Sequence, residues 1–324
     1  MSNIRLGIIG AGRMAREHLN VLRAINSVRV VAISSRTKSK AEALAQEFQI
    51  DHVYDDAHAL VKESQLEGLL VLVTDDQMYD VVSQLIPYRI PLFIEKPPGL
   101  TPELTLKLSG LTRQYALPTM VGYNRRYYSI FQKGIAKILE FGSLLGISIE
   151  GHERMWRIHE AGTFNPKIVA SWLYANSTHT IDLLRFFGGE VKELKVFGYK
   201  IRDPLGDQFA AVMKMDSGAL AQYQAFWYSP GGWRVVLYGD GVTVEFKPLE
   251  KGQWTDKNFK IHEILPDPED VQFKPGFYRQ MQAFIHLIKE GKGQWPMMDL
   301  ASAYETMLLA KKFADSAVSF KGKA

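Results

Sequence analysis

The sequence predicts an α/β protein in which a doubly wound parallel sheet is followed by an α+β domain with a large, mostly antiparallel open sheet. Three observations lead to this prediction. A glycine-rich turn joins an apolar strand to a helix within Ile4–Ala15. Apolar runs then alternate with helical patterns as far as Val121, which is typical of a parallel sheet covered on both faces. From Glu193 onward the apolar residues recur with a period of two, as antiparallel strands require.

The chain has 324 residues, which fits about two domains. We expect a dinucleotide-binding Rossmann domain over residues 1–122 and a substrate-binding and oligomerisation domain over residues 123–324, with the last helices able to pack back on the first domain. The net charge is +4, and no dense Lys/Arg block is present, which argues against a nucleic-acid partner.

The chain contains no cysteine. Disulfides, thiolate metal ligands and a cysteine nucleophile are therefore excluded, and the composition fits a cytoplasmic location. The longest strongly apolar run, Gly68–Val73, is far shorter than a membrane span. Because Met1 leads almost directly into the first strand, we expect neither a signal peptide nor a membrane partner.

The first strand, Ile4–Ile9, ends in Gly10-Ala11-Gly12, and a helix follows from Met14. Gly10 allows the tight turn, Gly12 lets phosphates approach the backbone, and the helix N-terminus offers unpaired N–H groups. A strand–turn–helix without a ligand is the alternative. We favour a dinucleotide site, which we expect Arg13 and Met14 to contact as well.

The second strand, Val28–Ile33, ends about 20 residues after the glycine turn, where an acidic residue normally binds the adenosine ribose. Ser35 and Arg36 stand there instead, with Lys38 and Lys40 nearby. A Ser-Arg pair can bind a 2′-phosphate that an acid would repel. The sequence therefore favours NADP, with NAD as the second option and a solvated arginine as the alternative.

Further elements of the first domain follow in alternation. The expected strands and helices are Lys38–Phe48, Ala57–Glu63, Leu69–Val73, Gln77–Ile86, Pro91–Ile94, a helix capped by Thr101, and Pro118–Val121. Ligands of such sheets bind at the carboxyl ends of the strands. Thr74, Asp76, Glu95 and Lys96 follow strand ends and are expected to contact the cofactor.

The second domain begins with a helix over Ile130–Glu140 and a strand over Gly146–Gly151. A further helix, capped by Ser177 or Thr178, ends at Gly188. The remaining elements are strands over 194–197, 209–215, 219–227, 234–238 and 243–247 and helices over 277–288 and 300–313. One face of this sheet can pack on helices. The other carries aromatics and methionines, which suits a homodimer or homotetramer.

Four segments together resemble the Gfo/Idh/MocA family (glucose–fructose oxidoreductase, inositol 2-dehydrogenase and rhizopine catabolism proteins). They are the glycine turn, Glu95-Lys96-Pro97, Gly122–Arg126 and His179–Asp182, and they keep the family's order over nearly the whole chain. The resemblance implies an NAD(P)-dependent oxidoreductase acting on an alcohol or ketone carbon of a small sugar, polyol or sugar nucleotide. The family also reduces non-carbohydrate substrates.

The resemblance assigns roles to two side chains. It implies that Lys96 lies near the nicotinamide and the substrate, and that His179 is the acid–base group of alcohol–ketone interconversion. A surface lysine and a structural histidine are the alternatives. Residues expected to line the substrate pocket are Tyr123, Arg126, Trp172, Asn176 and His179. Arg126 can equally pair with a carboxylate across the domain junction.

Two departures from the family pattern stand out. The family's Thr-Pro-Asn-x-x-His segment reads Thr74-Asp-Asp-Gln-Met-Tyr79 here, and Ala175 stands where an aspartate usually precedes the histidine. These departures motivate the alternative of a non-catalytic, NADP-binding regulatory protein. No metal is expected, because the histidines lack metal-ligand spacing.

Overall fold

The computed structural model describes residues 3–320 of the chain. These residues form two compact units. The first comprises the residues up to Asn124 together with Glu269–Tyr304, and the second comprises Arg125–Pro268 together with the residues from Glu305 on. Within residues 3–320, no helix is both long and apolar enough to cross a membrane.

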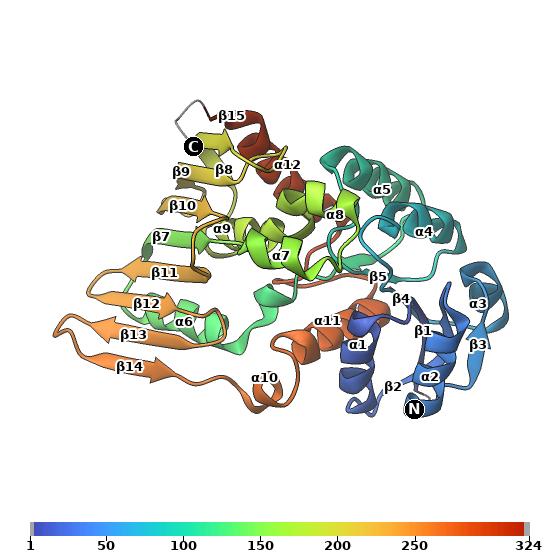
Figure 1. The fold of residues 1–324 in the computed structure, drawn as a ribbon. Coiled ribbons are helices and arrows are strands. Elements are labelled where there is room, and N and C mark those ends of the chain that lie inside the picture. Colours follow the sequence, from blue (N-terminus) through green and yellow to red (C-terminus); the bar gives the residue numbers. More distant parts are fainter. Residues whose placement is uncertain (1–2, 321–324) are drawn as a thin grey trace. The chain divides into compact units, whose positions relative to one another are not determined.

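The first unit is built on a six-stranded parallel sheet with the order β3-β2-β1-β4-β5-β6 (Figure 1). The strands are β1 (Ile4–Ile9), β2 (Val28–Ser34), β3 (His52–Tyr54), β4 (Gly68–Val71), β5 (Leu92–Ile94) and β6 (Thr119–Val121). The strand order reverses between β1 and β4, which is where doubly wound sheets bind ligands. The sheet confirms the predicted Rossmann fold.

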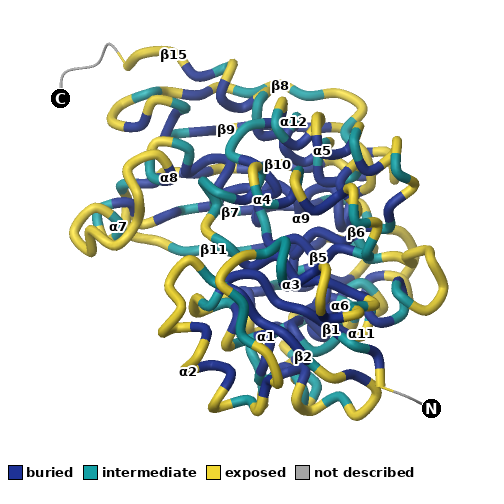
Figure 2. The backbone as a smooth tube through the Cα atoms, turned by 90° about the vertical axis from the view of Figure 1, so that its right-hand side faces the viewer, coloured by how far each residue is buried: buried dark blue, intermediate teal, exposed yellow. Residues whose placement is uncertain are grey.

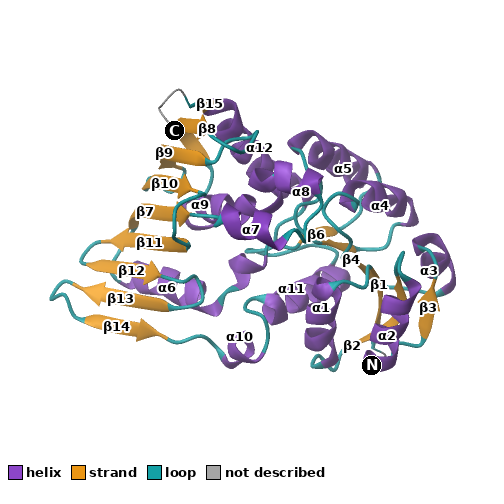
Figure 3. Cartoon of the chain, viewed as in Figure 1, coloured by secondary structure: helices purple, strands orange, loops and turns teal. Residues whose placement is uncertain are grey.

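Helices alternate with these strands (Figure 3). They are α1 (Arg13–Arg23), α2 (Lys38–Phe48), α3 (Ala57–Glu63), α4 (Met78–Leu85), the 3-10 turn η1 (Ile86–Tyr88), α5 (Pro102–Gln114) and α11 (Phe277–Glu290). The late helix α11 packs on α1. Right-handed crossovers in the two directions from β1 place helices on both faces of the sheet, so its strands are largely buried (Figure 2).

Local capping follows the sequence expectations in part. The Thr101 hydroxyl accepts a hydrogen bond from the Leu104 N–H, and Pro102 opens α5. The helix after β4 differs, because α4 begins at Met78 without a side-chain cap. The three-residue strand β3 was not expected, since so short a run carries no clear period.

The second unit is built on a nine-stranded sheet with the order β14-β13-β12-β11-β7-β10-β9-β8-β15. The strands are β7 (Leu144–Gly151), β8 (Val191–Lys200), β9 (Gln208–Met215), β10 (Leu220–Phe226), β11 (Trp233–Gly239), β12 (Val242–Phe246), β13 (Gly252–Asp256), β14 (Ile261–Ile264) and β15 (Ala317–Ser319). Two pairs, β7 with β10 and β8 with β15, are parallel, and the other pairs are antiparallel. This confirms the predicted large, mostly antiparallel sheet.

Helices cover one face of this sheet (Figure 1). α6 (Ser129–Glu140) packs on β11–β14, and α9 (Thr178–Gly188) packs on β7 and β10. The remaining helical segments are η2 (Asn124–Tyr127), α7 (Met155–Ala161), α8 (Pro166–Ala170), the π-helical turn η3 (Leu173–Ser177), α10 (Pro268–Gln272) and α12 (Leu300–Ser316).

The other face of the sheet is open and carries exposed apolar side chains. Phe197 is 72% exposed, Val212 57% and Leu220 63%. Methionines do not contribute as expected. Met213 and Met215 are buried, because the alternation along β9 turns them away from the open face, toward the side on which Gly188 of α9 lies.

Candidate active site

A cavity of about 370 Å³ lies in the first unit at the carboxyl ends of β1, β2 and β4. The predicted cofactor residues that line it are Gly10, Gly12, Ser35, Arg36 and Thr74. Parts of the chain more than 60 residues apart thus meet at the edge of the sheet where its strand order reverses. This position matches the binding site of a dinucleotide.

The two glycines of the turn do different things. Gly10 has φ +106°, and a Cβ there would lie 2.4 Å from the backbone oxygen of Leu72. Gly12 is the N-cap of α1, and a Cβ there would meet no atom within 4 Å. Because α1 has no acidic residue in its first turn, its N–H groups and dipole face open space suited to a diphosphate.

The end of β2 supplies the cations of this cavity. Arg36 and Lys40 line it, and both side chains are exposed. Lys38 instead pairs with Asp55 at 2.9 Å. Asp76 does not line the cavity, but the charge of Arg36 is close enough to lower the pKa of Asp76. Burial acts to raise the pKa of Asp76, and hydrogen bonds from Thr74 and Gln77 together with the Arg36 charge lower it below its usual value.

Glu95 and Lys96 directly follow β5. A carboxylate oxygen of Glu95 lies 3.1 Å from Nε2 of His18, and the other accepts a hydrogen bond from the Lys96 backbone N–H at 3.1 Å. Burial acts to raise the pKa of Glu95, but the His18 contact and the charges of Lys96 and Lys274 outweigh it and lower that pKa. A buried carboxylate therefore lies close enough to the predicted catalytic lysine to bond its backbone and to feel its charge.

A second carboxylate shares this environment. Asp75, at the end of the neighbouring strand β4, has its pKa raised to about 6 by burial, against the opposing charge of Lys96. The family resemblance gave no role to this side chain. It results from the departure at residues 74–79.

Other predicted residues of the first unit lie elsewhere. Tyr123 is 1% exposed and belongs to the hydrophobic core, and its role as a substrate ligand stays a prediction. Arg13 is exposed. Met14 is half-buried, and Nζ of Lys274 lies 3.6 Å from its sulfur.

In the second unit, Trp172 and Asn176 line a cavity of about 260 Å³ together with Glu153 and Trp233. His179 is 6% exposed, and its ring centre lies 6.0 Å from that of Trp233. The predicted capping of α9 by Ser177 or Thr178 is wrong. The helix continues from η3 without a free first turn, so the Ser177 hydroxyl donates to Glu153 and that of Thr178 to the Tyr174 carbonyl.

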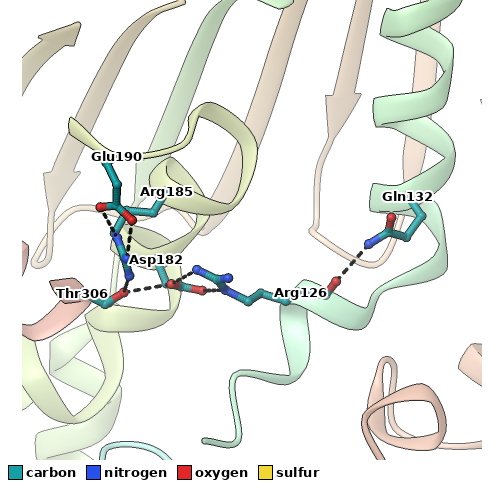
Figure 4. A network of polar contacts seen from close by, with 6 residues as sticks. All are labelled: Arg126, Gln132, Asp182, Arg185, Glu190 and Thr306. Carbon is teal, nitrogen blue, oxygen red and sulfur yellow. Dashed lines mark hydrogen bonds and ion pairs between the residues drawn. The ribbon is translucent and has the colours of Figure 1, made fainter. Parts of the chain in front are cut away.

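Arg126 forms a buried, bidentate ion pair with Asp182 (Figure 4). Its Nε and Nη2 each lie 2.7 Å from a carboxylate oxygen. The Thr306 hydroxyl donates to Asp182 at 2.9 Å, and the guanidinium of Arg185 donates to Thr306. The ion pair is one of the two roles expected for Arg126, although it lies within one unit. The role in substrate binding stays a prediction.

Two residues of interest were not anticipated. His18 lies on the buried side of α1 with Ala15, Leu19 and Leu22. In the sequence, a polar side chain at a position of the apolar face is the feature that could have singled it out. Glu153 follows β7 in a loop whose sequence shows no pattern that distinguishes it. Only the folded chain brings it to the segment before His179.

Comparison with known proteins identifies one family along the chain. The profile described as "Oxidoreductase family, NAD-binding Rossmann fold" matches residues 4–123. The "GFO/IDH/MocA C-terminal domain" profile matches residues 140–245. Together the two matches span more than half of the chain.

Individual relatives are distant. The uncharacterized oxidoreductase YrbE of Bacillus subtilis is 26% identical over 66% of this chain and 64% of its own length. Myo-inositol 2-dehydrogenase of Thermotoga maritima is 24% identical over 89% of both proteins. The crystal structure of a dehydrogenase from Chromobacterium violaceum has the same fold, with a TM-score of 0.83 at 20% identity over 98% of this chain and 96% of that one.

Proposed function

Because the chain belongs to the Gfo/Idh/MocA family of oxidoreductases, we propose that it is an NADP-preferring enzyme that transfers hydride to or from an alcohol or ketone carbon of a sugar, polyol or sugar nucleotide. The observation that carries this proposal is the cavity at the ends of β1, β2 and β4. It brings the glycine turn together with two cations, Arg36 and Lys40, which follow β2. This supports a diphosphate at the turn and a 2′-phosphate at the end of β2. The name of the Thermotoga relative supports a polyol-type substrate.

The chain's own residues bind the reactants and move a proton. A nicotinamide cofactor, when bound, supplies or accepts the hydride. Lys96 Nζ donates a hydrogen bond to the reacting oxygen, and His179 gives or takes the proton that accompanies hydride transfer. Glu95 adds a buried negative charge next to Lys96 in the sequence, and the charge of Lys96 helps to lower the pKa of Glu95. Trp172 and Asn176 orient the substrate.

The preference for NADP rests on the end of β2. Ser35 and Arg36 line the cavity, and Lys40 adds a second cation. A guanidinium binds a phosphate group through two parallel hydrogen bonds, which the ribose hydroxyl of NAD cannot reproduce. NAD therefore binds the same cavity more weakly.

Replacing Arg36 with alanine tests this preference. We expect NADPH affinity to fall about 10- to 100-fold while NADH affinity changes little, because only the 2′-phosphate contact is lost. Lys38→Ala is the matched control, since Lys38 pairs with Asp55. Affinities come from titrating the quenching of protein fluorescence. An unchanged ratio of NADPH to NADH affinity in Arg36→Ala would refute the preference.

Enzyme activity is tested by following NADPH formation from NADP and a panel of polyols and sugars, and NADPH oxidation by the matching ketones. Turnover of one class identifies the substrate. Tight NADPH binding with no turnover of any compound would instead support the non-catalytic alternative, which Ala175 motivates.

We also propose that the open face of the second unit's sheet joins copies of this chain into a homodimer or homotetramer. Phe197, Val212 and Leu220 are large apolar side chains exposed on this face. Light scattering of the purified protein measures its mass in solution. Phe197→Glu is expected to shift that mass toward the monomer, and a monomeric wild-type protein would contradict the proposal.

A further inference from the structure

Glu153 places a buried carboxylate against the segment that precedes His179. The residue follows β7 and is 7% exposed. It accepts hydrogen bonds from Trp172 Nε1 at 3.0 Å, Asn176 Nδ2 at 2.6 Å and Ser177 Oγ at 2.6 Å. The three donors lie on both sides of position 175, which is an alanine.

The hydrogen bonds of Glu153 leave room for one more donor. An indole N–H and an amide NH₂ can only donate, so Glu153 acts as the acceptor in this group. Burial raises the pKa of Glu153, while the three hydrogen bonds and the charge of Arg125 favour its ionised form. When ionised, the carboxylate offers about four acceptor sites, of which these three donors use three. Since Glu153 lines the 260 Å³ cavity, its remaining acceptor capacity is available to a ligand there.

The walls of this cavity suit a ring-shaped polyhydroxylated molecule. Trp172 and Trp233 supply aromatic surface, and Asn176 and Glu153 supply polar groups. The Arg125 guanidinium lies 4.3 Å from the centre of the Trp233 ring, and Trp233 contacts His179. Apolar ring faces pack on aromatics while hydroxyl groups bind polar side chains, which is the general pattern of small-molecule pockets.

We propose that Glu153 is a specificity-determining residue whose carboxylate accepts a hydrogen bond from one hydroxyl group of a neutral polyol or sugar. It also holds the Trp172 indole and the Asn176 amide that face the same ligand. From the end of β7 it places a carboxylate beside the segment in which position 175 is an alanine. A substrate carboxylate or phosphate at this point would have no proton to donate and would repel Glu153. This inference rests on the proposed function.

The test is a double-mutant-type cycle. It compares the affinities of the wild type and of Glu153→Gln for a polyol probe and for analogues that each lack one hydroxyl group. Calorimetry measures the binding of myo-inositol and its monodeoxy analogues to the NADPH-saturated protein. No turnover occurs there, because an alcohol and a reduced cofactor cannot exchange hydride. For the wild type, we expect one monodeoxy analogue to bind about 10- to 100-fold more weakly than myo-inositol, as loss of a hydrogen bond to a charged group requires.

Glu153→Gln is expected to weaken myo-inositol binding by a similar factor. The variant should bind the monodeoxy analogue that the wild type disfavours as well as it binds myo-inositol. The other analogues keep their wild-type ratios. Glu250→Gln is the matched control, because Glu250 lines the same cavity but its carboxylate accepts from the Tyr128 hydroxyl at 3.3 Å. NADPH affinity serves as the folding control, since its predicted ligands lie in the first unit.

Equal weakening of every analogue in Glu153→Gln would overturn the inference, as would failure of the wild type to bind any of the polyols. Should Glu153→Gln not fold, Glu153→Asp replaces it. Aspartate keeps the negative charge, but its side chain is shorter by one methylene group. The affinity difference between myo-inositol and the disfavoured analogue should therefore be smaller than in the wild type. If Glu153→Gln removes the discrimination of one hydroxyl group but NADP oxidises no polyol, this inference stands and the proposed function is refuted.

If NADP oxidises a polyol but Glu153→Gln changes the discrimination of no single hydroxyl group, the proposed function stands and this inference is refuted. With a substrate that is oxidised, we expect Glu153→Gln to raise KM and to leave kcat within a few-fold.

Discussion

The Nε2 atom of His18 lies 3.1 Å from a carboxylate oxygen of Glu95, although 77 residues separate the two in the sequence. His18 is fully buried between the rings of Phe93 and Phe277. The helix that begins at the glycine turn is thereby joined to the strand end that carries Lys96. One buried contact couples the two halves of the predicted cofactor site within the first unit.

Replacing His18 with alanine is expected to lower the free energy of unfolding by about 3–5 kcal/mol, because it leaves the Glu95 carboxylate buried without its partner. Urea denaturation measures this loss. Glu95→Gln combined with His18→Ala should cost less than the sum of the two single changes. His58→Ala is the control, since His58 bonds to Tyr88 at a partly exposed site and should cost about 1 kcal/mol. Additive losses at His18 and Glu95 would show that they are not coupled.

The two glycines of the turn should respond differently to alanine. Gly10→Ala forces a Cβ against the Leu72 carbonyl at a positive φ, so we expect loss of stability as well as loss of NADPH binding. Gly12→Ala meets no protein atom, so its melting temperature should stay close to that of the wild type while NADPH affinity falls. Thermal denaturation and NADPH titration of both variants separate these effects. Unchanged NADPH affinity in Gly12→Ala would contradict the assigned diphosphate site.

Asp75 should make the protein less stable as the pH rises from about 4 to 6. Its pKa is raised from 3.8 to about 6, so the folded protein retains a proton that the unfolded chain has lost. Asp75→Asn removes this penalty and should raise the free energy of unfolding at pH 7 by roughly 1–3 kcal/mol, with little effect below pH 4.

Asp76 provides the control of opposite sign. The pKa of Asp76 is lowered in the folded protein. Its carboxylate therefore stabilises the fold at pH values above the usual pKa of an aspartate, and this contribution is lost as the pH falls through the lowered pKa. Asp76→Asn should therefore destabilise the protein at neutral pH. Chemical denaturation across this pH range compares the two variants. Parallel pH profiles for Asp75→Asn and the wild type would contradict the raised pKa of Asp75.

Both Lys96 and His179 should be needed for turnover. Lys96→Met keeps the length of the side chain without its charge, and we expect it to abolish measurable oxidation of the substrate. His179→Gln should lower kcat about 10²- to 10⁴-fold, the usual contribution of a general acid or base. NADPH affinity of His179→Gln should match the wild type, because His179 belongs to the second unit. Wild-type kcat in Lys96→Met would remove this lysine from the mechanism.

The sequence was informative wherever one segment carries its own physical requirement. The turn at Gly10 and Gly12, the Thr101–Pro102 helix start and the alternation along β9 and β10 follow from local sterics, capping and period. They were predicted correctly. The strands β13 and β14 were missed because each has only four or five residues, too few for a sustained apolar alternation.

Partners distant in the chain were beyond such local patterns. The Arg126–Asp182 pair, the contact of His18 with Glu95 and the three donors around Glu153 depend on which strands and helices become neighbours. Nothing in the spacing of these residues indicates that choice.

The sequence by itself determined the class of fold, the position of the glycine turn and the cations that follow β2, because each rests on residues close together in the chain. Tertiary structure alone decided that the buried His18 contacts the carboxylate of Glu95, and that Glu153 lines the cavity beside the segment before His179. A buried charge is stable only where folding brings it a partner, and those partners lie 77 residues away for Glu95 and 19 to 24 residues away for Glu153.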